Sequence, residues 1–171
     1  MLFRSDSAEI AKYLDKTYPD TPKLFPQGSG ALQEAFLDGA WSSVGYPLFM
    51  NVILRTCKAL NPRSEEYFRT TREALFGDKL ENLGGEKQWE AMEAALAKIN
   101  TWLSANGPGK DLLLMGDKVC FSDIQIAGLL VWARVLFRED SDDWKRISGW
   151  HDGKWKKLLE YFDKYAAVDN V

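Results

Sequence analysis

The chain has 171 residues and a mass of 19.5 kDa, enough for one domain with a good hydrophobic core. Its 46% hydrophobic and 27% charged residues exclude a disordered or collagen-like chain, and a net charge of −3 argues against binding nucleic acid through a basic surface. Two cysteines are too few for a disulfide scaffold, and with a single histidine they cannot complete a four-ligand zinc site.

The first helix is predicted to run from about residue 5 to Pro19. Asp6 and Ser7 are good N-caps, and acidic side chains favour the positive end of a helix. Pro19 ends the helix, because the residue before a proline disfavours helical geometry. Residues 20–30 hold further prolines and glycines and are predicted to form a linker.

Residues 31–60 are predicted to be helical, with Gly45 and Pro47 bending or breaking the helix in the middle. A further helix is predicted over 64–80. The clearest pattern follows, where large apolar residues alternate at steps of three and four and are expected to face the core. They are Trp89, Met92, Leu96, Ile99 and Leu103.

In the second half of the chain, the apolar run 112–115 is expected to be an extended loop packed on the core, with a short strand as the alternative. Helix is predicted to resume over 121–137, and the acidic run 139–143 is interpreted as a break between helices. A last helix is predicted over 153–166. Since no segment alternates like a strand, these elements predict an all-α bundle.

The most apolar stretch, residues 124–137, contains Gln125 and Arg134. A membrane-spanning helix needs about 20 apolar residues, so this stretch predicts a buried helix. Residues 1–6 lack the apolar core of a signal peptide. We therefore expect a cytoplasmic protein of a reducing compartment that contacts no membrane.

Taken alone, the reactive residue types indicate little chemistry. No metal-ligand spacing, phosphate-binding loop or nucleophile motif occurs, so no metal cofactor is expected. His151 is interpreted as a structural or solvent-exposed histidine and Cys57 as a buried, inert thiol. Cys120 falls at a helix start, where a thiolate is favoured, but Lys118 is the sole basic residue nearby, so a nucleophile is the minor interpretation.

Three segments resemble the glutathione S-transferase family. Residues 5–15, followed by a Tyr-Pro pair, are similar to the end of the family's thioredoxin-like domain. Residues 116–124 are similar to the capping box and hydrophobic staple that open the central helix of its all-α domain. Residues 67–77 resemble fungal members in particular.

This resemblance implies a glutathione S-transferase C-terminal-like helical bundle over residues 31–171. Residues 1–19 would be a remnant of the thioredoxin-like domain, its last helix, and residues 20–30 the linker between the two. Complete members carry the catalytic serine, cysteine or tyrosine in a β-α-β unit ahead of this helix. That unit is missing from this sequence, so the catalytic residue is unknown.

The capping box departs from the family pattern, because Cys120 stands where the family has serine or threonine and sulfur is a weak acceptor. In one interpretation Asp123 caps the N–H of Cys120, and the flanking apolar residues form the staple. The staple residues of this first interpretation would be Val119 and Ile124. In the alternative, Ser122 is the N-cap and Gln125 its box partner.

The resemblance also implies binding residues. It assigns the binding of the γ-glutamyl end of glutathione to Asp6 and Ser7. The Asp6 carboxylate suits the ammonium group of glutathione, and Ser7 with the N–H groups at the helix start suits its carboxylate. The alternative is that both residues merely cap the helix. The acceptor substrate would lie against the first helices of the all-α domain. The aromatic candidates there would contact the substrate, and core packing is the alternative role for them. Arg72 would act as a fixed cation. The candidates are Trp41, Tyr46, Tyr67 and Arg72.

The function expected from the resemblance is an enzyme that adds the glutathione thiolate to a small hydrophobic electrophile. The reaction would be conjugation or glutathione-dependent double-bond isomerisation, in detoxification or secondary metabolism. The alternative is a non-catalytic helical module for protein association. A homodimer is expected in either case, with no nucleic-acid partner.

Overall fold

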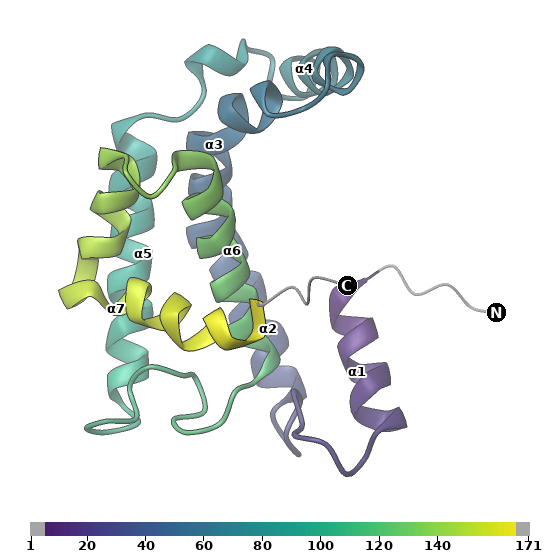
Figure 1. Cartoon of the computed structure of the whole chain (residues 1–171), viewed down its shortest axis with the longest axis vertical. Coiled ribbons are helices and arrows are strands. Elements are labelled where there is room, and N and C mark those ends of the chain that lie inside the picture. Colours follow the sequence, from purple (N-terminus) through teal and green to yellow (C-terminus); the bar gives the residue numbers. More distant parts are fainter. Residues whose placement is uncertain (1–5, 167–171) are drawn as a thin grey trace.

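The computed structural model describes residues 6–166 as a series of helices joined by loops (Figure 1). Within that range the chain forms no strand, and a lone β-bridge joins Leu113 to Gly116. The all-α prediction is confirmed, and the run 112–115 is a loop. In chain order the elements are α1 (Ser7–Thr17), α2 (Gly30–Ala40), the π-helix η1 (Trp41–Gly45), α3 (Tyr46–Lys58), α4 (Pro62–Phe76), the 3-10 helix η2 (Leu80–Asn82), α5 (Glu86–Ser104), α6 (Phe121–Phe137) and α7 (Asp142–Ala166).

The larger hydrophobic cluster lies between α3, α5, α6 and α7, and the Trp155 side chain is fully buried in it. A smaller cluster is formed by Ile53, Cys57 and Leu80. The predicted stripe of α5 faces the larger cluster. Its members Trp89, Met92, Leu96, Ile99 and Leu103 are all buried. The Trp89 ring packs on Phe137 and Trp150 at centroid separations of 5.3 and 6.2 Å, so α5 joins both neighbouring helices to the core.

The apolar stretch 124–137 is a buried helix, as predicted, and α6 begins at Phe121 and ends at Phe137. Its core-facing side chains include Ile126 and Leu130. No helix in residues 6–166 is both long and apolar enough to cross a membrane.

The helical segment predicted over residues 31–60 continues past Gly45 and Pro47 without a break. Helix α2 passes into the wider turn of η1 and directly into α3, with the Tyr46 N–H bonded to the Trp41 carbonyl five residues back. This wider turn accommodates Pro47, whose nitrogen has no hydrogen to donate. The alternative of a break at Gly45 and Pro47 is therefore wrong, and a π-turn marks the position where the sequence predicts a disturbance of the helix.

Helix α4 begins and ends earlier than predicted. The Asn61 side chain accepts the Ser64 N–H at 3.0 Å and so caps the start. Gly77 ends the helix after Phe76 by taking the left-handed conformation, with φ 68°. Leu80, placed in the same helix by the prediction, is buried in η2 instead.

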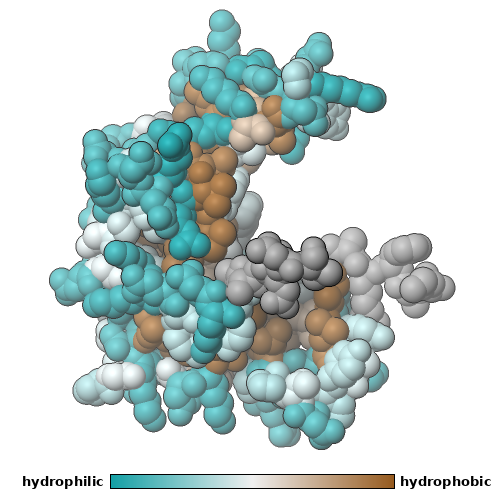
Figure 2. Space-filling view, viewed as in Figure 1, coloured by the Kyte–Doolittle hydropathy of each residue, from teal (hydrophilic) through white to brown (hydrophobic). Residues whose placement is uncertain are grey.

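Helix α4 has no buried residue, and it packs on α3 and η2. In Figure 1 it stands at the opposite end of the bundle from the α1–α2 linker. Figure 2 shows a hollow between these two ends with apolar surface on its inner side.

The acidic run 139–143, predicted as a break, contains the start of a helix. Ser141 Oγ accepts the Trp144 N–H at 3.1 Å, and acidic residues occupy the first turn, where the helix dipole favours negative charge. The predicted break is present over residues 138–141, between the end of α6 and the start of α7. The helix that begins at Asp142 was not predicted, because acidic residues suit a loop and a helix start equally well. Residues 150–153 then interrupt α7, and its last part matches the predicted helix 153–166.

Candidate functional site

A cleft of about 230 Å³ lies where the N-terminal ends of α1 and α6 meet the junction of α2 and η1. It brings together three residues that the sequence singles out for ligand binding: Asp6, Ser7 and Trp41. The lining residues are Asp6, Ser7, Ala8, Leu37, Ala40, Trp41, Phe121, Gln125, Ile126 and Leu129. The cleft is therefore polar at the start of α1 and apolar along α2 and α6.

Asp6 caps α1 with one oxygen of its carboxylate. Oδ1 accepts the N–H of Ala8 at 2.8 Å and that of Glu9 at 3.2 Å. Oδ2 accepts no hydrogen bond from the described residues. Capping and ligand binding are therefore compatible, because one oxygen serves the helix and the other is open to a cationic group.

Ser7 faces α6 across the cleft. Gln125 Nε2 donates a long hydrogen bond of 3.4 Å to Ser7 Oγ, linking two residues 118 positions apart in the sequence. This contact brings the Ser7 hydroxyl next to a polar side chain of α6. The sequence suggested Gln125 as the capping-box partner of Ser122. Nothing in its local spacing indicated a contact with α1.

Trp41 forms the apolar end of the cleft, and its side chain is 54% exposed. The indole lies over Gly45, since a Cβ atom at that position would come within 2.5 Å of Trp41 Cε3. A side chain at position 45 would therefore displace the ring that packs there. Because both residues belong to η1, the π-turn sets the position of the indole at the cleft.

The start of α6 follows the first of the two capping interpretations, with Cys120 as the N-cap. Asp123 Oδ2 accepts the Cys120 N–H at 2.9 Å, and Oδ1 accepts the Leu114 N–H at 2.7 Å. Burial raises the pKa of the Asp123 carboxyl, while these backbone hydrogen bonds act in the opposite direction. The carboxylate ties the preceding loop to the helix.

The alternative, Ser122 as the N-cap, is wrong. Ser122 lies inside the first turn of α6, and both its N–H and its Oγ donate to Gln33 Oε1, at 3.0 and 3.2 Å. Gln33 Nε2 in turn donates to the Leu24 carbonyl at 3.0 Å. This fully buried amide joins α2, α6 and the linker, and sequence reasoning missed it because its partner lies 89 residues away.

The linker is clamped from its other side by α1. Both oxygens of Asp15 accept backbone N–H groups, from Leu24 at 3.0 Å and Phe25 at 2.7 Å. The Phe25 ring stacks on Phe121 with centroids 5.1 Å apart. The two clamps set α1 against the start of α6 and so define the cleft.

Neither cysteine is placed to act as a nucleophile. Burial, and next the neighbouring Asp123 carboxylate, raises the pKa of the Cys120 thiol to about 12. Burial likewise raises the pKa of Cys57, which is an inert core thiol, as predicted. The minor interpretation of Cys120 as a nucleophile is therefore wrong.

His151 has the structural role expected for it. Its Nδ1 accepts the indole N–H of Trp155 at 2.8 Å, inside the interruption of α7. Among residues 6–166 there is no cluster of histidine, cysteine and acidic side chains that could hold a metal ion.

The other predicted substrate-binding residues do not line the cleft. Tyr46 and Tyr67 are exposed, 45% and 70%, so core packing is excluded for both. Tyr67 and Arg72 lie on α4, where the Arg72 guanidinium sits 4.9 Å from the centre of the Phe68 ring. Their role in substrate binding stays a prediction without support from the cleft.

Comparison with known proteins decides the family. Residues 31–165 match the C-terminal domain of glutathione S-transferases. The chain belongs to the glutathione S-transferase family. The glutathione S-transferase-like protein ustS of Aspergillus flavus is 31% identical to it over 169 residues, which cover 90% of this chain and 57% of the relative.

Solved structures of glutathione transferases from fungi are similar to this chain. GSTFuA3 from Phanerochaete chrysosporium superposes with a TM-score of 0.93 at 54% identity, over 96% of this chain and 66% of that one. GSTFuA2 from the same organism gives 0.93 at 48%, over 97% and 67%. CsGST63524 of Ceriporiopsis subvermispora, solved in complex with glutathione, gives 0.90 at 44%, over 98% and 68%. The chain thus spans 57% of the curated relative and about two thirds of the solved relatives.

Proposed function

We propose that this chain is a glutathione S-transferase-like enzyme that joins the glutathione thiolate to a small hydrophobic electrophile. The observation that carries the proposal is the pairing in one cleft of an open carboxylate oxygen on Asp6 with the Ser7 hydroxyl, opposite an apolar wall that ends at Trp41. A polar start and an apolar end suit a peptide thiol and an apolar acceptor, respectively.

Each cleft residue has a role in this proposal. Asp6 Oδ2 receives the ammonium group of the γ-glutamyl end of glutathione, and the Ser7 hydroxyl, at the positive end of α1, receives its carboxylate. The Trp41 indole offers a flat surface to the acceptor.

The reaction forms a bond between the thiolate sulfur and an electrophilic carbon. In conjugation, a leaving group departs with its electron pair, or a neighbouring carbon takes up a proton. In isomerisation, the adduct rotates about the former double bond and expels the thiolate, so that glutathione is recovered. Neither cysteine is proposed to activate the thiol, since both are buried and burial raises the pKa of each.

Calorimetric titration with reduced glutathione tests the binding step. Asn caps a helix as well as Asp does, so Asp6→Asn keeps the cap but removes the charge. We expect saturable binding to the unaltered chain and about tenfold or greater weakening in Asp6→Asn, with a loss in Ser7→Ala. The matched control is Asp20→Asn, at an exposed position outside the cleft.

Two outcomes would contradict the binding proposal: no saturable heat with the unaltered chain, or equal affinity in Asp6→Asn. The catalytic step is tested separately by turnover of glutathione with a panel of electrophiles and activated alkenes. Binding without turnover would support the proposed glutathione site and contradict the proposed catalytic activity.

The second candidate is a non-catalytic helical module for protein association. It is favoured by the apolar surface of α1, where Ile10 and Leu14 are exposed, together with Tyr18, the residue that follows the helix. Because this candidate needs no glutathione, a negative titration supports it.

We also propose that the protein is a cytoplasmic homodimer. Besides α1, helix α4 exposes Leu75, and exposed apolar helix faces are commonly covered by a second copy. Light scattering at working concentration measures the mass directly, and a monomer would contradict the dimer.

A further inference from the structure

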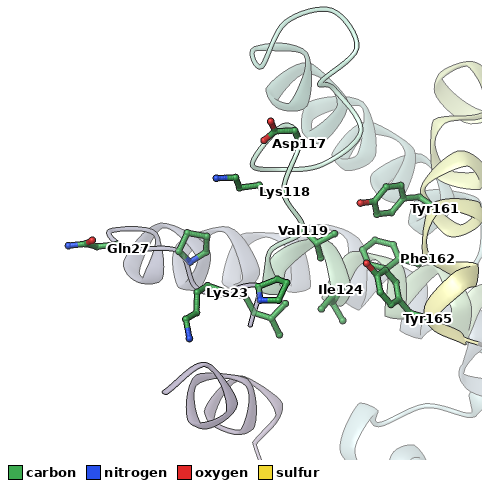
Figure 3. A pocket seen from close by; sticks show the side chains of 12 residues that line it. Lys23, Gln27, Asp117, Lys118, Val119, Ile124, Tyr161, Phe162 and Tyr165 are labelled. Atoms are coloured by element: carbon green, nitrogen blue, oxygen red, sulfur yellow. The ribbon is translucent and has the colours of Figure 1, made fainter. Parts of the chain in front are cut away.

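Helix α7 lines cavities at its last turns and at its interruption. At its last turns, the Tyr161, Phe162 and Tyr165 rings border a cavity of about 930 Å³ that also has linker residues in its wall (Figure 3). At its interruption, a polar cavity of about 500 Å³ lies between α7, the end of α5 and the loop that follows α5. This polar cavity shares no lining residue with the larger one or with the cleft. Its lining residues are Asn100, Ser104, Asp111, Leu112, His151, Asp152, Lys154 and Lys157.

The interruption of α7 holds two of these residues in an unfavourable backbone conformation. His151, Asp152 and Gly153 follow one another with φ of 54°, 58° and 74°, in the left-handed region. Residues with a Cβ atom rarely adopt this conformation, so His151 and Asp152 hold it at a cost in free energy. The Trp155 indole N–H, which donates to His151 Nδ1 at 2.8 Å, supports the turn. Strained backbone is common at ligand sites, and here both strained residues line the polar cavity.

The charged groups of the polar cavity already have partners. Lys154 Nζ donates to Asp111 Oδ2 at 2.8 Å and to the Asp111 carbonyl at 3.0 Å. Lys157 Nζ donates to the Asp152 carbonyl at 3.0 Å. The lining holds two lysines and two aspartates, so its formal charges cancel. A net charge on a ligand would therefore gain little there, and the cavity favours a neutral ligand.

Single hydrogen-bond positions of both kinds remain open in this lining. Asn100 Oδ1 is buried and accepts no hydrogen bond from residues 6–166, and Asp111 Oδ1 accepts none from another described residue. Burial lowers the pKa of His151, so its ring is neutral near pH 7. Because Nδ1 accepts the indole N–H, the proton lies on Nε2, where none of the described residues accepts it. A buried acceptor without a partner costs free energy, and a donor on a ligand would recover it.

Hydroxyl groups fit this pattern best, since each one both donates and accepts a hydrogen bond. We propose that the polar cavity binds a small neutral polyol such as a monosaccharide, with neighbouring hydroxyls at Asn100, Asp111 and His151. Lys157, with one N–H donated to the chain, supplies a further donor. A volume of about 500 Å³ is within the usual range for a small-molecule site. The proposal goes beyond the glutathione reaction, because it requires neither glutathione nor any residue of the cleft.

The test is an NMR titration of the full chain, without a histidine tag, with D-glucose. His151 is the sole histidine of the sequence, so its ring gives one Cε1–H signal that reports on the cavity. The comparison compound is tetrahydropyran, which has the six-membered ring without the hydroxyls. We expect a saturable shift of the His151 signal with glucose, with a Kd of about 1–10 mM, and no saturable shift with tetrahydropyran.

Two variants locate the sugar. Asn100→Leu keeps the shape of the side chain and removes an amide that no described residue bonds, so the fold should not be weakened. It should weaken glucose binding about three- to tenfold, and Lys157→Met should weaken it about two- to fivefold. Lys87→Met, at an exposed position of α5 outside the cavity, is the matched control and should leave the affinity unchanged.

A shift that grows linearly with glucose and never saturates would overturn the proposal, as would an equal response to tetrahydropyran. Unchanged glucose affinity in both Asn100→Leu and Lys157→Met would overturn it too, because the sugar would then bind elsewhere. Saturating reduced glutathione should leave the glucose affinity unchanged, and competition between the two would contradict a separate sugar site.

Discussion

At the scale of single residues, Gln33 positions three elements through one amide. Its oxygen accepts two donors of Ser122, and its nitrogen donates to the Leu24 carbonyl, all within the buried interior. Gln33→Met keeps the volume but leaves the Ser122 donors unpaired. We expect the free energy of unfolding to fall by about 1–3 kcal/mol, measured by urea denaturation. Gln88→Met, whose amide has no hydrogen-bond partner among residues 6–166, should change stability little; an equal loss there would refute the role of Gln33.

His151 makes stability depend on pH. Its Nδ1 accepts the Trp155 indole N–H, and a protonated ring would place two donors against each other. Burial, with Lys154 assisting against Glu93 and Asp152, lowers the pKa of His151. The unfolded chain therefore binds the proton first, and the free energy of unfolding should fall as pH drops below about 6.5.

The slope of that fall is at most about 1.4 kcal/mol per pH unit, because one proton is involved. His151 is the sole histidine of the sequence, so urea midpoints compared between about pH 7.5 and pH 5.5 report on it. His151→Asn, whose side chain tolerates the left-handed φ of 54°, should flatten the dependence. An unchanged slope in this variant would assign the pH effect elsewhere.

At the scale of elements, we expect alanine substitution to have opposite effects at two glycines of the helical segment that contains η1. At Gly45 a Cβ would meet the Trp41 ring at 2.5 Å, whereas at Gly39 it would meet nothing within 4 Å. Gly45→Ala should therefore destabilise by about 1–3 kcal/mol and change the near-ultraviolet circular dichroism as the indole moves. Gly39→Ala should stabilise by about 0.5–1 kcal/mol. Equal effects of the two substitutions would mean that the indole does not rest on Gly45.

The elements also show where sequence patterns suffice. The α5 stripe and the bounds of α6 follow from apolar periodicity, which local spacing records. The first half of α7 was missed, because its acidic first turn resembles a loop. The start of α1 in the cleft was predicted from capping chemistry and family resemblance. The contacts of Gln33, which lies outside the cleft and joins the elements around it, and of Gln125, which lines the cleft, were not predicted. Their partners lie 89 and 118 residues away, and only the folded chain brings such pairs together.

At the scale of the whole molecule, stability is expected to be uneven. Helix α1 buries Ala11 alone, whereas α5 buries its whole apolar stripe, and α1 is attached largely through polar contacts of Asp15 with the linker. Elements with few buried apolar contacts open at lower free energy than the core. Amide hydrogen exchange should therefore be faster in α1 than in α5, and Asp15→Asn should accelerate it further in α1 alone.

The same exchange experiment tests the association proposed above. If a second copy covers Ile10 and Leu14, protection of α1 should rise with protein concentration while that of α5 stays constant, because dimerisation is bimolecular. If α1 is as protected as α5 at every dilution, its attachment within one chain is stronger than these contacts account for. If α1 is unprotected at every concentration, its apolar face is left without a partner in solution, and the dimer, if present, uses another surface.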